Sequence, residues 1–411
     1  MRRGRIGSAA ALALLLAACS SGSKDEGGAG TLLIVVNAPF SVSPAIGQTI
    51  LQGTQLAVDE INRAGGISAG GRAYRLRVER MDNALSAQQG LENVRRAVDQ
   101  HALAIVDEGT GVDASWREAA RAHVPICIVY QGGSGLIDPA QRTNVFRIAP
   151  TDHGIAFRYA EHLVPQDLKV ALLHDDSGYG QEGAAALHQA FGFTPKAVAA
   201  DVVLPGGGQD LSPQILEARR SGATALVVWA QATTLAQAVR TARQSGWDVP
   251  IYAPPAGEDP LVRQELSDHP EWVDGMTFAA GRMTAEAGPE PFLEFQRDYE
   301  RAFGPDEVGV KTSDGDDVVQ PPDYAMYPFD FVNVLAAAVA GAGGPDGSKV
   351  VSSLEQVDVR GANGDERSFN EKNHEGVVDD DVYFAVFHDM TFRPVEDDPL
   401  SSTLPVIDQT R

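Results

Sequence analysis

Short runs of β-branched and aliphatic residues alternate with amphipathic stretches along most of the chain. The first such run covers residues 31–37 (TLLIVVN), and the set that it opens ends with the apolar segment 126–130. A second set begins at residues 169–174 (KVALLH) and ends at 251–253 (IYA). Strands that alternate with helices of about ten to fifteen residues imply right-handed βαβ units and parallel sheets. The pattern therefore predicts an α/β protein with two doubly wound, Rossmann-like lobes.

The helices expected between these strands carry apolar residues at every third or fourth position. They cover residues 50–64, 86–100 and 114–122 in the first set, and 180–191, 211–221 and 235–246 in the second. The later part is less regular, with helices expected at 290–303 and 329–342 and strands near 357 and at 382–388. Doubly wound sheets bind ligands at the carboxyl ends of their strands, so two facing lobes would define a cleft.

The amino-terminal segment has the composition of a secretory signal peptide. Arg2, Arg3 and Arg5 precede an apolar stretch at 9–18 that is too short to span a bilayer. The stretch ends in LAAC at 16–19, which resembles the lipobox of bacterial lipoproteins, in which the Cys is acylated and becomes the first mature residue. We therefore expect a signal peptide at 1–19, lipidation of Cys19 and a flexible tether at 20–30. An ordinary cleavage site with a chance cysteine is the alternative.

Composition limits what the remaining chain can do. About 380 of the 411 residues remain, more than one hydrophobic core usually serves, which again favours two lobes. The formal net charge of −23 argues against a nucleic-acid partner, because phosphates call for clustered Lys and Arg. Cys127 lies in an apolar strand and is expected to be a buried, inert thiol. We expect no disulfide, no metal site and no cofactor.

The most informative motif is GTQLAVDEINRAGGI at residues 53–67. As a helix it would turn Leu56 and Ile61 towards the sheet and stop at Gly65 and Gly66, which readily adopt positive φ. The segment resembles the "G..LAVDEIN..GGI" pattern of branched-chain amino-acid-binding proteins, which are type I periplasmic binding proteins of ABC importers. Further segments follow in the order of that family: the turn at Asp82, FRIAPTD at 146–152, DDSGYG at 175–180, the helix at 329–342 and the strand at 382–388.

The resemblance implies a chain that crosses between the lobes three times, which makes a three-stranded hinge. We place the crossings near Pro150, Ala280 and Gly361. The first lobe would then comprise residues 31–150 and 281–360, the second 151–280 and 361–393, with a carboxy-terminal tail at 394–411. Hinge closure over a ligand is the motion that this fold implies, and periplasmic binding proteins are the usual example of it.

In the relatives, the first lobe holds a ligand carboxylate with backbone N–H groups and small hydroxyls that follow two strands. The matching positions here are Gly109, Thr110, Gly132, Gly133 and Ser134. Glycine lets the backbone approach an anion closely, and helix N-termini offer unpaired N–H groups. Ordinary Gly-rich turns with capping residues are the alternative interpretation.

The walls and the mouth of the cleft are expected to come from both lobes. The resemblance places Tyr179 over the ligand, at the start of a helix, and Phe40 and Ser41 at the mouth, after the first strand. The remaining wall positions are Trp229, Gln231, Ala232 and Tyr324. For Trp229 and Tyr324, which are placed in the walls, burial in the core is the alternative interpretation.

One position departs from the pattern of the family. Its amino-acid binders pair the ligand's ammonium with an acidic residue after the last strand of the second lobe, and Pro255 stands there in this chain. Glu258, three residues later, is the candidate partner if the loop is longer. Without it, a buried ammonium would lack a counter-charge, which is costly. A carboxylate, amide, urea-like or aromatic ligand then becomes an option.

The expected function is binding without catalysis. A monomer anchored through Cys19 would capture a branched-chain or related amino acid for an ABC permease and its ATPase. A lipoprotein that reports its ligand to a signalling partner is the alternative. An enzyme would need a nucleophile with a base or a metal cluster, but the histidines do not form an H-E-x-x-H motif. The GGSG segment at 132–135 also lacks the final Gly of a nucleophile elbow.

Overall fold

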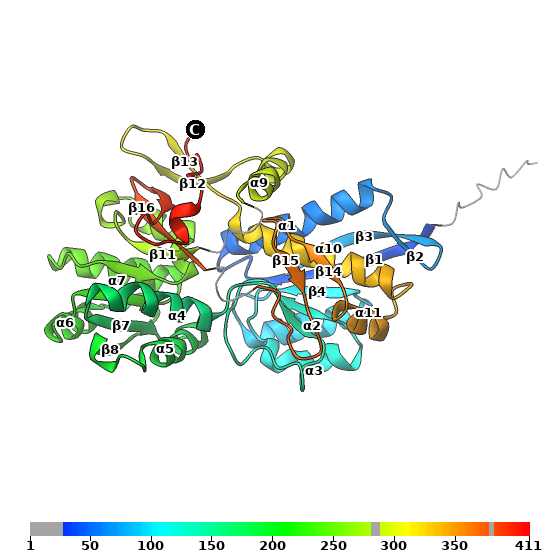
Figure 1. The fold of residues 1–411 in the computed structure, drawn as a ribbon, viewed down its shortest axis with the longest axis horizontal. Helices are drawn as coiled ribbons and strands as arrows, with labels where there is room; N and C mark the ends of the chain where they lie inside the picture. The colour runs from blue at the N-terminus through cyan, green and yellow to red at the C-terminus, as the bar shows by residue number, and fades with distance from the viewer. Residues whose placement is uncertain (1–27, 281–287, 378–381) are drawn as a thin grey trace, which may run out of the picture.

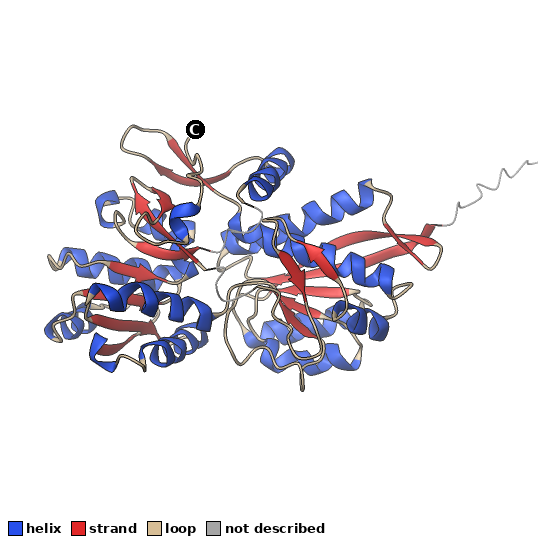
Figure 2. Cartoon of the chain, in the orientation of Figure 1, coloured by secondary structure: helices blue, strands red, loops and turns tan. Residues whose placement is uncertain are grey.

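The computed structural model describes residues 28–280, 288–377 and 382–411. The predicted signal peptide, Cys19 and most of the predicted tether lie outside these residues. Figure 1 shows two α/β lobes side by side, and Figure 2 shows a sheet flanked by helices in each. The predicted fold class, two doubly wound lobes, is confirmed. Within the described ranges, no helix combines the length and the apolar composition needed to cross a bilayer.

The sheet of the first lobe has the strand order β2-β3-β1-β4-β5-β6, and β2 alone runs antiparallel to its neighbour. Helices α1, α10 and α11 cover one face, and α2 and α3 cover the other. The strands are β1 (Gly28–Ala38), β2 (Ile67–Ala69), β3 (Arg72–Asp82), β4 (Ala104–Asp107), β5 (Ile126–Ile128) and β6 (Val145–Arg147). The helices are α1 (Pro44–Arg63), α2 (Ala87–Asp99), α3 (Val112–Arg121), α10 (Met326–Gly341) and α11 (Gly347–Leu354).

The ends of α1 follow from its sequence. The helix begins at Pro44, whose fixed φ suits the first helical position and whose missing N–H is not needed there. It stops before Gly65 and Gly66, which have φ values of 107° and 89° that other residues rarely adopt. A Cβ at Gly66 would also meet the backbone of Tyr74 in β3. The glycine pair therefore turns the chain straight into the antiparallel β2–β3 hairpin.

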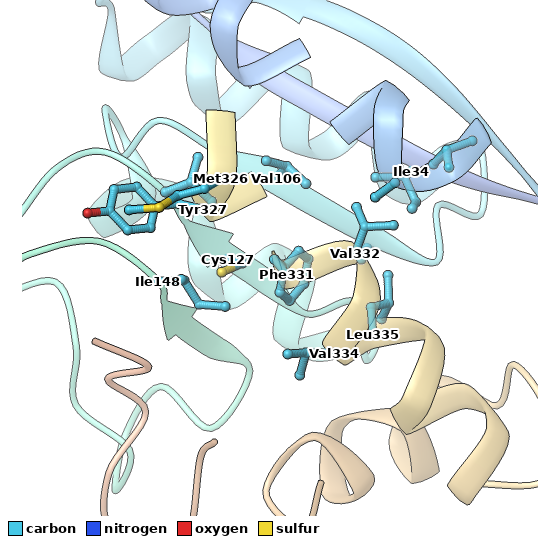
Figure 3. Packing of buried hydrophobic residues seen from close by; sticks show 14 of the residues in the cluster. Ile34, Val106, Cys127, Ile148, Met326, Tyr327, Phe331, Val332, Val334 and Leu335 are labelled. Carbon is cyan, nitrogen blue, oxygen red and sulfur yellow. The ribbon is translucent and has the colours of Figure 1, made fainter. Parts of the chain in front are cut away.

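Helix α10 packs its apolar side chains on the strands of the first sheet (Figure 3). Phe331 and its neighbours belong to the same core cluster as Cys127 and Val106, which are register partners on adjacent strands. Cys127 is fully buried, as predicted. This burial raises the pKa of its thiol well above the ordinary value, so the thiolate that reacts or binds metals is disfavoured.

The sheet of the second lobe has the order β17-β16-β11-β10-β9-β7-β8, with β16 antiparallel to β11 and to β17. Two core clusters lie on its two faces. Its strands are β7 (Val170–Asp175), β8 (Val198–Leu204), β9 (Ala225–Trp229), β10 (Ile251–Ala253), β11 (Thr277–Ala280), β16 (Tyr383–His388) and β17 (Thr391–Pro394). Its helices are α4 (Asp152–Leu163), α5 (Gly178–Phe191), α6 (Ser212–Arg220), α7 (Ala232–Gln244) and α8 (Pro260–Glu265).

The remaining elements join the lobes or extend them. Helix α9 (Glu290–Phe303) packs on α1, and the hairpin of β12 (Asp306–Lys311) and β13 (Asp317–Gln320) follows it. A second hairpin consists of β14 (Asp358–Arg360) and β15 (Glu366–Ser368). The short 3-10 helices are η1 (Val164–Gln166), η2 (Pro195–Ala197), η3 (Pro255–Glu258), η4 (Pro270–Trp272), η5 (Asp323–Ala325) and η6 (Ser401–Thr403).

The last crossing between the lobes lies later in the chain than the predicted position near Gly361. The β14–β15 hairpin packs on α10, and Phe369 and Val377 belong to the core of the first lobe. The rings of Phe146 and Phe369 lie 4.9 Å apart. Residues 361–377, which we assigned to the second lobe, therefore belong to the first. The apolar residues of this segment complete the core beside β6, which the local sequence does not reveal.

Two other boundaries also differ from the prediction. The β12–β13 hairpin, assigned to the first lobe, buries Val308, Val310 and Val318 in the core of the second. The predicted carboxy-terminal tail is an integral part of the structure. Buried Asp398 pairs with Arg158 of α4 at 2.9 Å, and Thr410 forms a β-bridge with Val318. The chain end thus fastens the hairpin to the second lobe.

Candidate ligand-binding site

A cavity of about 370 Å3 lies between the two lobes. Tyr130, which follows β5, and the first turns of α1 contribute from the first lobe. The loop after β10 and the start of α8 contribute from the second. The described residues that line the cavity are Ala45, Ile46, Gln48, Thr49, Tyr130, Pro255, Glu258, Asp259, Pro260, Gln264, Pro305, Asp306, Glu307, Gln320, Pro321 and Tyr324.

Direct contacts bridge the lobes beside this cavity. Ser43, at the start of α1, donates a hydrogen bond from its hydroxyl to Asp259 of the second lobe at 3.1 Å. Both residues are buried, and burial raises the pKa of the Asp259 carboxyl. Across the cavity, Gln320 Nε2 donates to Glu258 Oε1 at 2.8 Å. The bond from Ser43 thus joins the lobes through Asp259, which lines the cavity, whereas the bond between Gln320 and Glu258 lies within the second lobe.

Glu258 and Tyr324 line the cavity, as the sequence predicted for the site. Glu258 is 2 % exposed and ends the 3-10 helix η3, which begins at Pro255. The ring of Tyr324 lies 5.2 Å from the ring of Tyr130, measured between centroids. The hydroxyl of Tyr324 is buried and has no hydrogen-bond partner among the described residues. It is therefore a polar group that a ligand could satisfy.

The predicted carboxylate site after β4 is already engaged by a carboxylate of the chain. Glu108 accepts hydrogen bonds from the backbone N–H and from the hydroxyl of Thr110, both at 3.2 Å. It also accepts from Gln131 Nε2 at 2.8 Å and from Asn83 Nδ2 at 3.0 Å. Gly109 adopts a φ of 127°, and its N–H donates to Asp107. The donors predicted for the ligand are thus bonded to Glu108 and Asp107.

Glu108 is 2 % exposed, and desolvation raises the pKa of its carboxyl, although the hydrogen bonds from Gln131 and Asn83 act in the opposite direction. Asp107 is equally buried, and desolvation raises the pKa of its carboxyl to about 7. The end of β4 is therefore rich in acidic groups, whereas an anion site would need free donors or cations.

The second predicted carboxylate loop also faces acidic side chains. A Cβ at Gly132 would overlap the carboxylate of Asp152, and one at Gly133 would overlap the carboxylate of Glu182 from α5. These positions accept only glycine because two acidic side chains fill the space beside them. Arg147 also contacts this loop and donates to the carbonyl oxygens of Gln131 and Gly133 at 3.2 and 2.8 Å.

Several predicted residues lie outside the cavity. Ser134 is exposed, and Trp229 is fully buried in the core of the second lobe, where α5 passes so closely that a Cβ at Gly183 would overlap its indole. The N–H of Gln231 donates to Asp175 at 2.7 Å. Ala232 begins α7 and is buried.

The residues expected at the mouth, Phe40 and Ser41, and Tyr179, expected over the ligand, make their contacts elsewhere. Phe40 packs against Gly47 of α1, and the backbone N–H of Ser41 donates to Asp82 at 3.2 Å. Tyr179 lies beside Trp229, with ring centroids 6.1 Å apart. Its buried hydroxyl faces the N–H of Ala256 without a hydrogen bond of ordinary geometry. None of these three lines the cavity itself.

Sequence reasoning missed Tyr130, Gln320 and the cross-lobe pair of Ser43 and Asp259. Tyr130 was open to prediction, because it ends the apolar segment 126–130, two residues before the glycine loop that we singled out. Gln320 could not be predicted, because its place at the cavity depends on how the β12–β13 hairpin packs on the second lobe. Within residues 28–280, 288–377 and 382–411, no group of three or more His, Cys, Asp or Glu is arranged to hold a metal ion.

Comparisons with known proteins agree with this architecture. The family model described as "Periplasmic binding protein" matches residues 34–391. An "Amino acid binding protein" of Pseudomonas aeruginosa is 26% identical over 353 residues, which cover 82% of this chain and 86% of that protein.

Two solved structures share the fold. A periplasmic binding protein type 1 from Bordetella pertussis Tohama I superposes with a TM-score of 0.76 at 19% identity, covering 89% of this chain and all of that one. A branched-chain amino-acid transporter substrate-binding protein from Streptococcus pneumoniae, in complex with isoleucine, gives a TM-score of 0.72 at 21% identity, covering 88% and 97%. The family model thus matches most of the length of this chain. The chain therefore belongs to the periplasmic binding protein family, whose members bind solutes and are not enzymes.

Proposed function

We propose that this chain is the lipid-anchored, extracytoplasmic solute-binding protein of an ABC importer. It would capture a small polar ligand, a branched-chain or related amino acid or a derivative of one, by closing its lobes. The observation that carries the proposal is the cavity between the lobes, which residues of both line and which the bond between Ser43 and Asp259 bridges. Its volume of about 370 Å3 falls within the range of small-ligand sites.

The nature of the ligand is proposed from two kinds of support. The Pseudomonas relative is called an amino-acid-binding protein, and the Streptococcus structure contains isoleucine. In this chain, Glu258 offers a buried carboxylate at the cavity, so an ammonium is the group that it would pair with. Of the residues predicted from sequence, we keep Glu258, Tyr324 and Tyr179 as ligand-facing or closely supporting ones.

A ligand screen tests this proposal. The full chain, purified in a mild detergent, would be mixed with amino acids, their decarboxylated amines and their keto acids, and its melting temperature recorded. A ligand at about 100 times its dissociation constant stabilises the folded state by roughly 2.7 kcal/mol, which is readily detected. Glu258→Gln should abolish the shift caused by any ammonium compound, whereas Glu92→Gln, on the exposed side of α2, should not. If no compound binds, the proposed function is wrong.

Membrane anchoring and coupling to a permease need their own test. Cys19→Ser removes the only thiol that could be acylated in the LAAC motif, so the protein should move from the membrane to the soluble fraction after cell fractionation. Retention of the Cys19→Ser protein in the membrane would contradict the lipid anchor. Uptake of the bound compound should be lost when the gene for this chain is deleted, and a defect in signalling without loss of uptake would favour the sensing alternative.

A further inference from the structure

We infer that the cleft is built for a small organic cation that carries no carboxylate, such as a primary or alkylated amine with an apolar body. This inference rests on the proposed function, because it concerns the ligand of the same cavity. It narrows the ligand from amino acids to their carboxylate-free relatives. Three groups of contacts support it: the engaged donors of the first lobe, the acidic lining of the cavity, and the paired tyrosine rings.

The donors that would hold a ligand carboxylate are bonded to Glu108. This side chain takes both the N–H and the hydroxyl of Thr110, and two amide side chains, from Asn83 and Gln131, complete its shell. A ligand carboxylate placed at Thr110 would have to displace Glu108 from both donors of that residue. It would also lie beside a second buried carboxylate, that of Asp107. Like charges at such short range in a buried site repel strongly.

The loop at Gly132 and Gly133 is closed to an anion for the same reason. The carboxylate of Asp152 lies against Gly132, and that of Glu182, from the second lobe, lies against Gly133. Desolvation raises the pKa of both carboxyls, and the charge of Glu182 raises the pKa of Asp152 further, whereas Arg147 acts in the opposite direction on both. Arg147 directs one of its nitrogens to the loop carbonyls and the others to Glu375. Its charge is therefore paired with Glu375 and also acts on Asp152 and Glu182, so it is already shared among three acids of the chain.

The start of α1 is the remaining group of donors at the cavity. Ala45 and Ile46, in the first turn of this helix, line the cavity, and a helix N-terminus by itself favours an anion. Asp259 already lies there, held by the hydroxyl of Ser43 and by the N–H of Leu261. The positive end of the helix dipole is thus already paired with a carboxylate of the chain.

The lining of the cavity favours a cation. Four of the described lining residues are acidic, Glu258, Asp259, Asp306 and Glu307, and none of the described lining residues is Lys, Arg or His. Arg263 lies near two of these acids but behind the lining, with its guanidinium directed to Gln320 and to the carbonyl of Met390. A ligand ammonium would supply the positive charge that the lining lacks.

The aromatic residues suit the same kind of group. The rings of Tyr130 and Tyr324 lie 5.2 Å apart at an angle of 54°, and both residues line the cavity. Tilted aromatic rings beside carboxylates are the arrangement that recognises alkylated ammonium groups through cation–π attraction. Four prolines, Pro255, Pro260, Pro305 and Pro321, form apolar parts of the lining and suit an aliphatic body.

The test varies the charged group of a ligand while its apolar body stays the same. Leucine, isopentylamine and 4-methylpentanoate share one aliphatic group and differ in carrying both charges, only the ammonium or only the carboxylate. The same comparison would be made for valine with isobutylamine and for phenylalanine with phenethylamine, by calorimetric titration of the full chain in detergent, with choline as an alkylated ammonium. We expect at least one amine, or choline, to bind about tenfold more tightly than any of the three amino acids.

The outcomes separate this inference from the proposed function. Tighter or equal binding of the amino acids overturns the inference and leaves the proposed function in place. Binding of 4-methylpentanoate alone also overturns it, because the cleft would then hold an anion. If no compound binds, both the inference and the proposed function fail.

A variant of Glu108 adds an independent readout. Glu108→Gln removes the charge beside Thr110 with little change of shape, so the affinity for leucine should rise relative to that for isopentylamine by about tenfold. Glu92→Gln removes an exposed acid of the same lobe and should leave the ratio unchanged. An unchanged ratio in Glu108→Gln overturns the assigned role of Glu108. The series on the unmodified chain remains decisive if this variant does not fold.

Discussion

Strand β4 of the first lobe and strand β7 of the second end in the same residue type and begin their loops in the same way. Strand β4 ends at Asp107 and β7 at Asp175, and both side chains are almost fully buried. Asp107 accepts hydrogen bonds from Asn37 Nδ2 and from the N–H of Gly109, at 2.8 and 2.7 Å. Asp175 accepts from the N–H groups of Ser177 and Gln231, at 3.2 and 2.7 Å. In each lobe, one strand-end acid fixes the loops at the edge of the cleft.

The lobes differ at the next position. Glu108 is 2 % exposed and engages the donors of Thr110, whereas Asp176 is exposed and accepts a hydrogen bond from the N–H of Gly206 at 3.3 Å. The acid at the strand end therefore supports the loops in both lobes. The acid that follows it is buried and engages the donors of the turn in the first lobe, but it is exposed in the second. The comparison teaches that the residue directly after the strand-end acid decides whether the donors of the following turn are engaged, and that its burial makes the difference.

The largest expected effect concerns the scaffold role that the lobes share. Asp175→Ala leaves the partly buried N–H groups of Gln231 and Ser177 without their acceptor at a position that is itself buried, so we expect a loss of about 3 kcal/mol in the free energy of unfolding. Asp107→Ala should cost a similar amount, because Gly109 and Asn37 lose their acceptor in the same way. Urea unfolding followed by circular dichroism measures both.

The exposed neighbour provides the matched control for this first prediction. Asp176→Ala should change the free energy of unfolding by no more than about 0.5 kcal/mol, as is usual for surface positions. If Asp107→Ala lowered the free energy of unfolding as little as Asp176→Ala, Asp107 would not support the loops of its lobe. The two strand ends would then not share a scaffold role.

A smaller effect is expected where the lobes meet. Asp152 begins α4 of the second lobe, but its carboxylate lies against Gly132 of the first, and desolvation raises its pKa to about 7. Because the folded state holds this proton more tightly than the unfolded one, its contribution to stability falls as the pH rises from about 4 to about 7. Asp152→Asn should therefore be more stable than the unmodified chain at pH 8, by on the order of 2 kcal/mol, with the gain disappearing towards pH 4.

Urea unfolding at pH 8 and at pH 5 measures this dependence. Asp99→Asn, an exposed position at the end of α2, serves as the control and should show the same small difference at both pH values. A gain in Asp152→Asn that is equal at pH 5 and pH 8 would mean that Asp152 is ionised throughout, and that the cleft is less strongly desolvated than its burial indicates.

The same comparison shows how far the sequence can predict this molecule. Most of the central strands and their connecting helices were predictable, because apolar periodicity and the glycine pair at Gly65 and Gly66 act locally, whereas the short strands β2, β6 and β11 and helix α4 were not predicted. The crossing near Gly361 and the place of the β12–β13 hairpin were not, because Phe369 and Val308 find their cores through packing between distant segments.

The site was predictable in part for the same physical reason. The resemblance pointed to Tyr324 and to the loop after β10, where Pro255 and the candidate Glu258 lie, and all three line the cavity, although their role in binding a ligand stays a prediction. The burial of Glu108 depends on Asn83 and Gln131, which lie 25 and 23 residues away, so no local pattern distinguishes it from an ordinary surface acid. Trp229 was expected in a wall but is core, because Gly183 lets α5 pass directly over its indole.

The smallest expected effect concerns the contact that joins the two lobes. Ser43→Ala removes the hydrogen bond to Asp259 and with it part of the preference for the closed arrangement. Loss of one such bond corresponds to about 1 kcal/mol, so affinity for isopentylamine, or for leucine measured in parallel, should fall roughly fivefold. Ser212→Ala is the matched control, because Ser212 donates to Asp210 at 2.6 Å within the second lobe alone and should leave the affinity unchanged. Calorimetric titration gives both values, and small-angle scattering of the ligand-free proteins should show a more extended average shape for Ser43→Ala only. If Ser43→Ala bound its ligand as tightly as the unmodified chain, the lobes would not depend on this bond for closure, and the acidic cavity alone would have to hold them around the ligand.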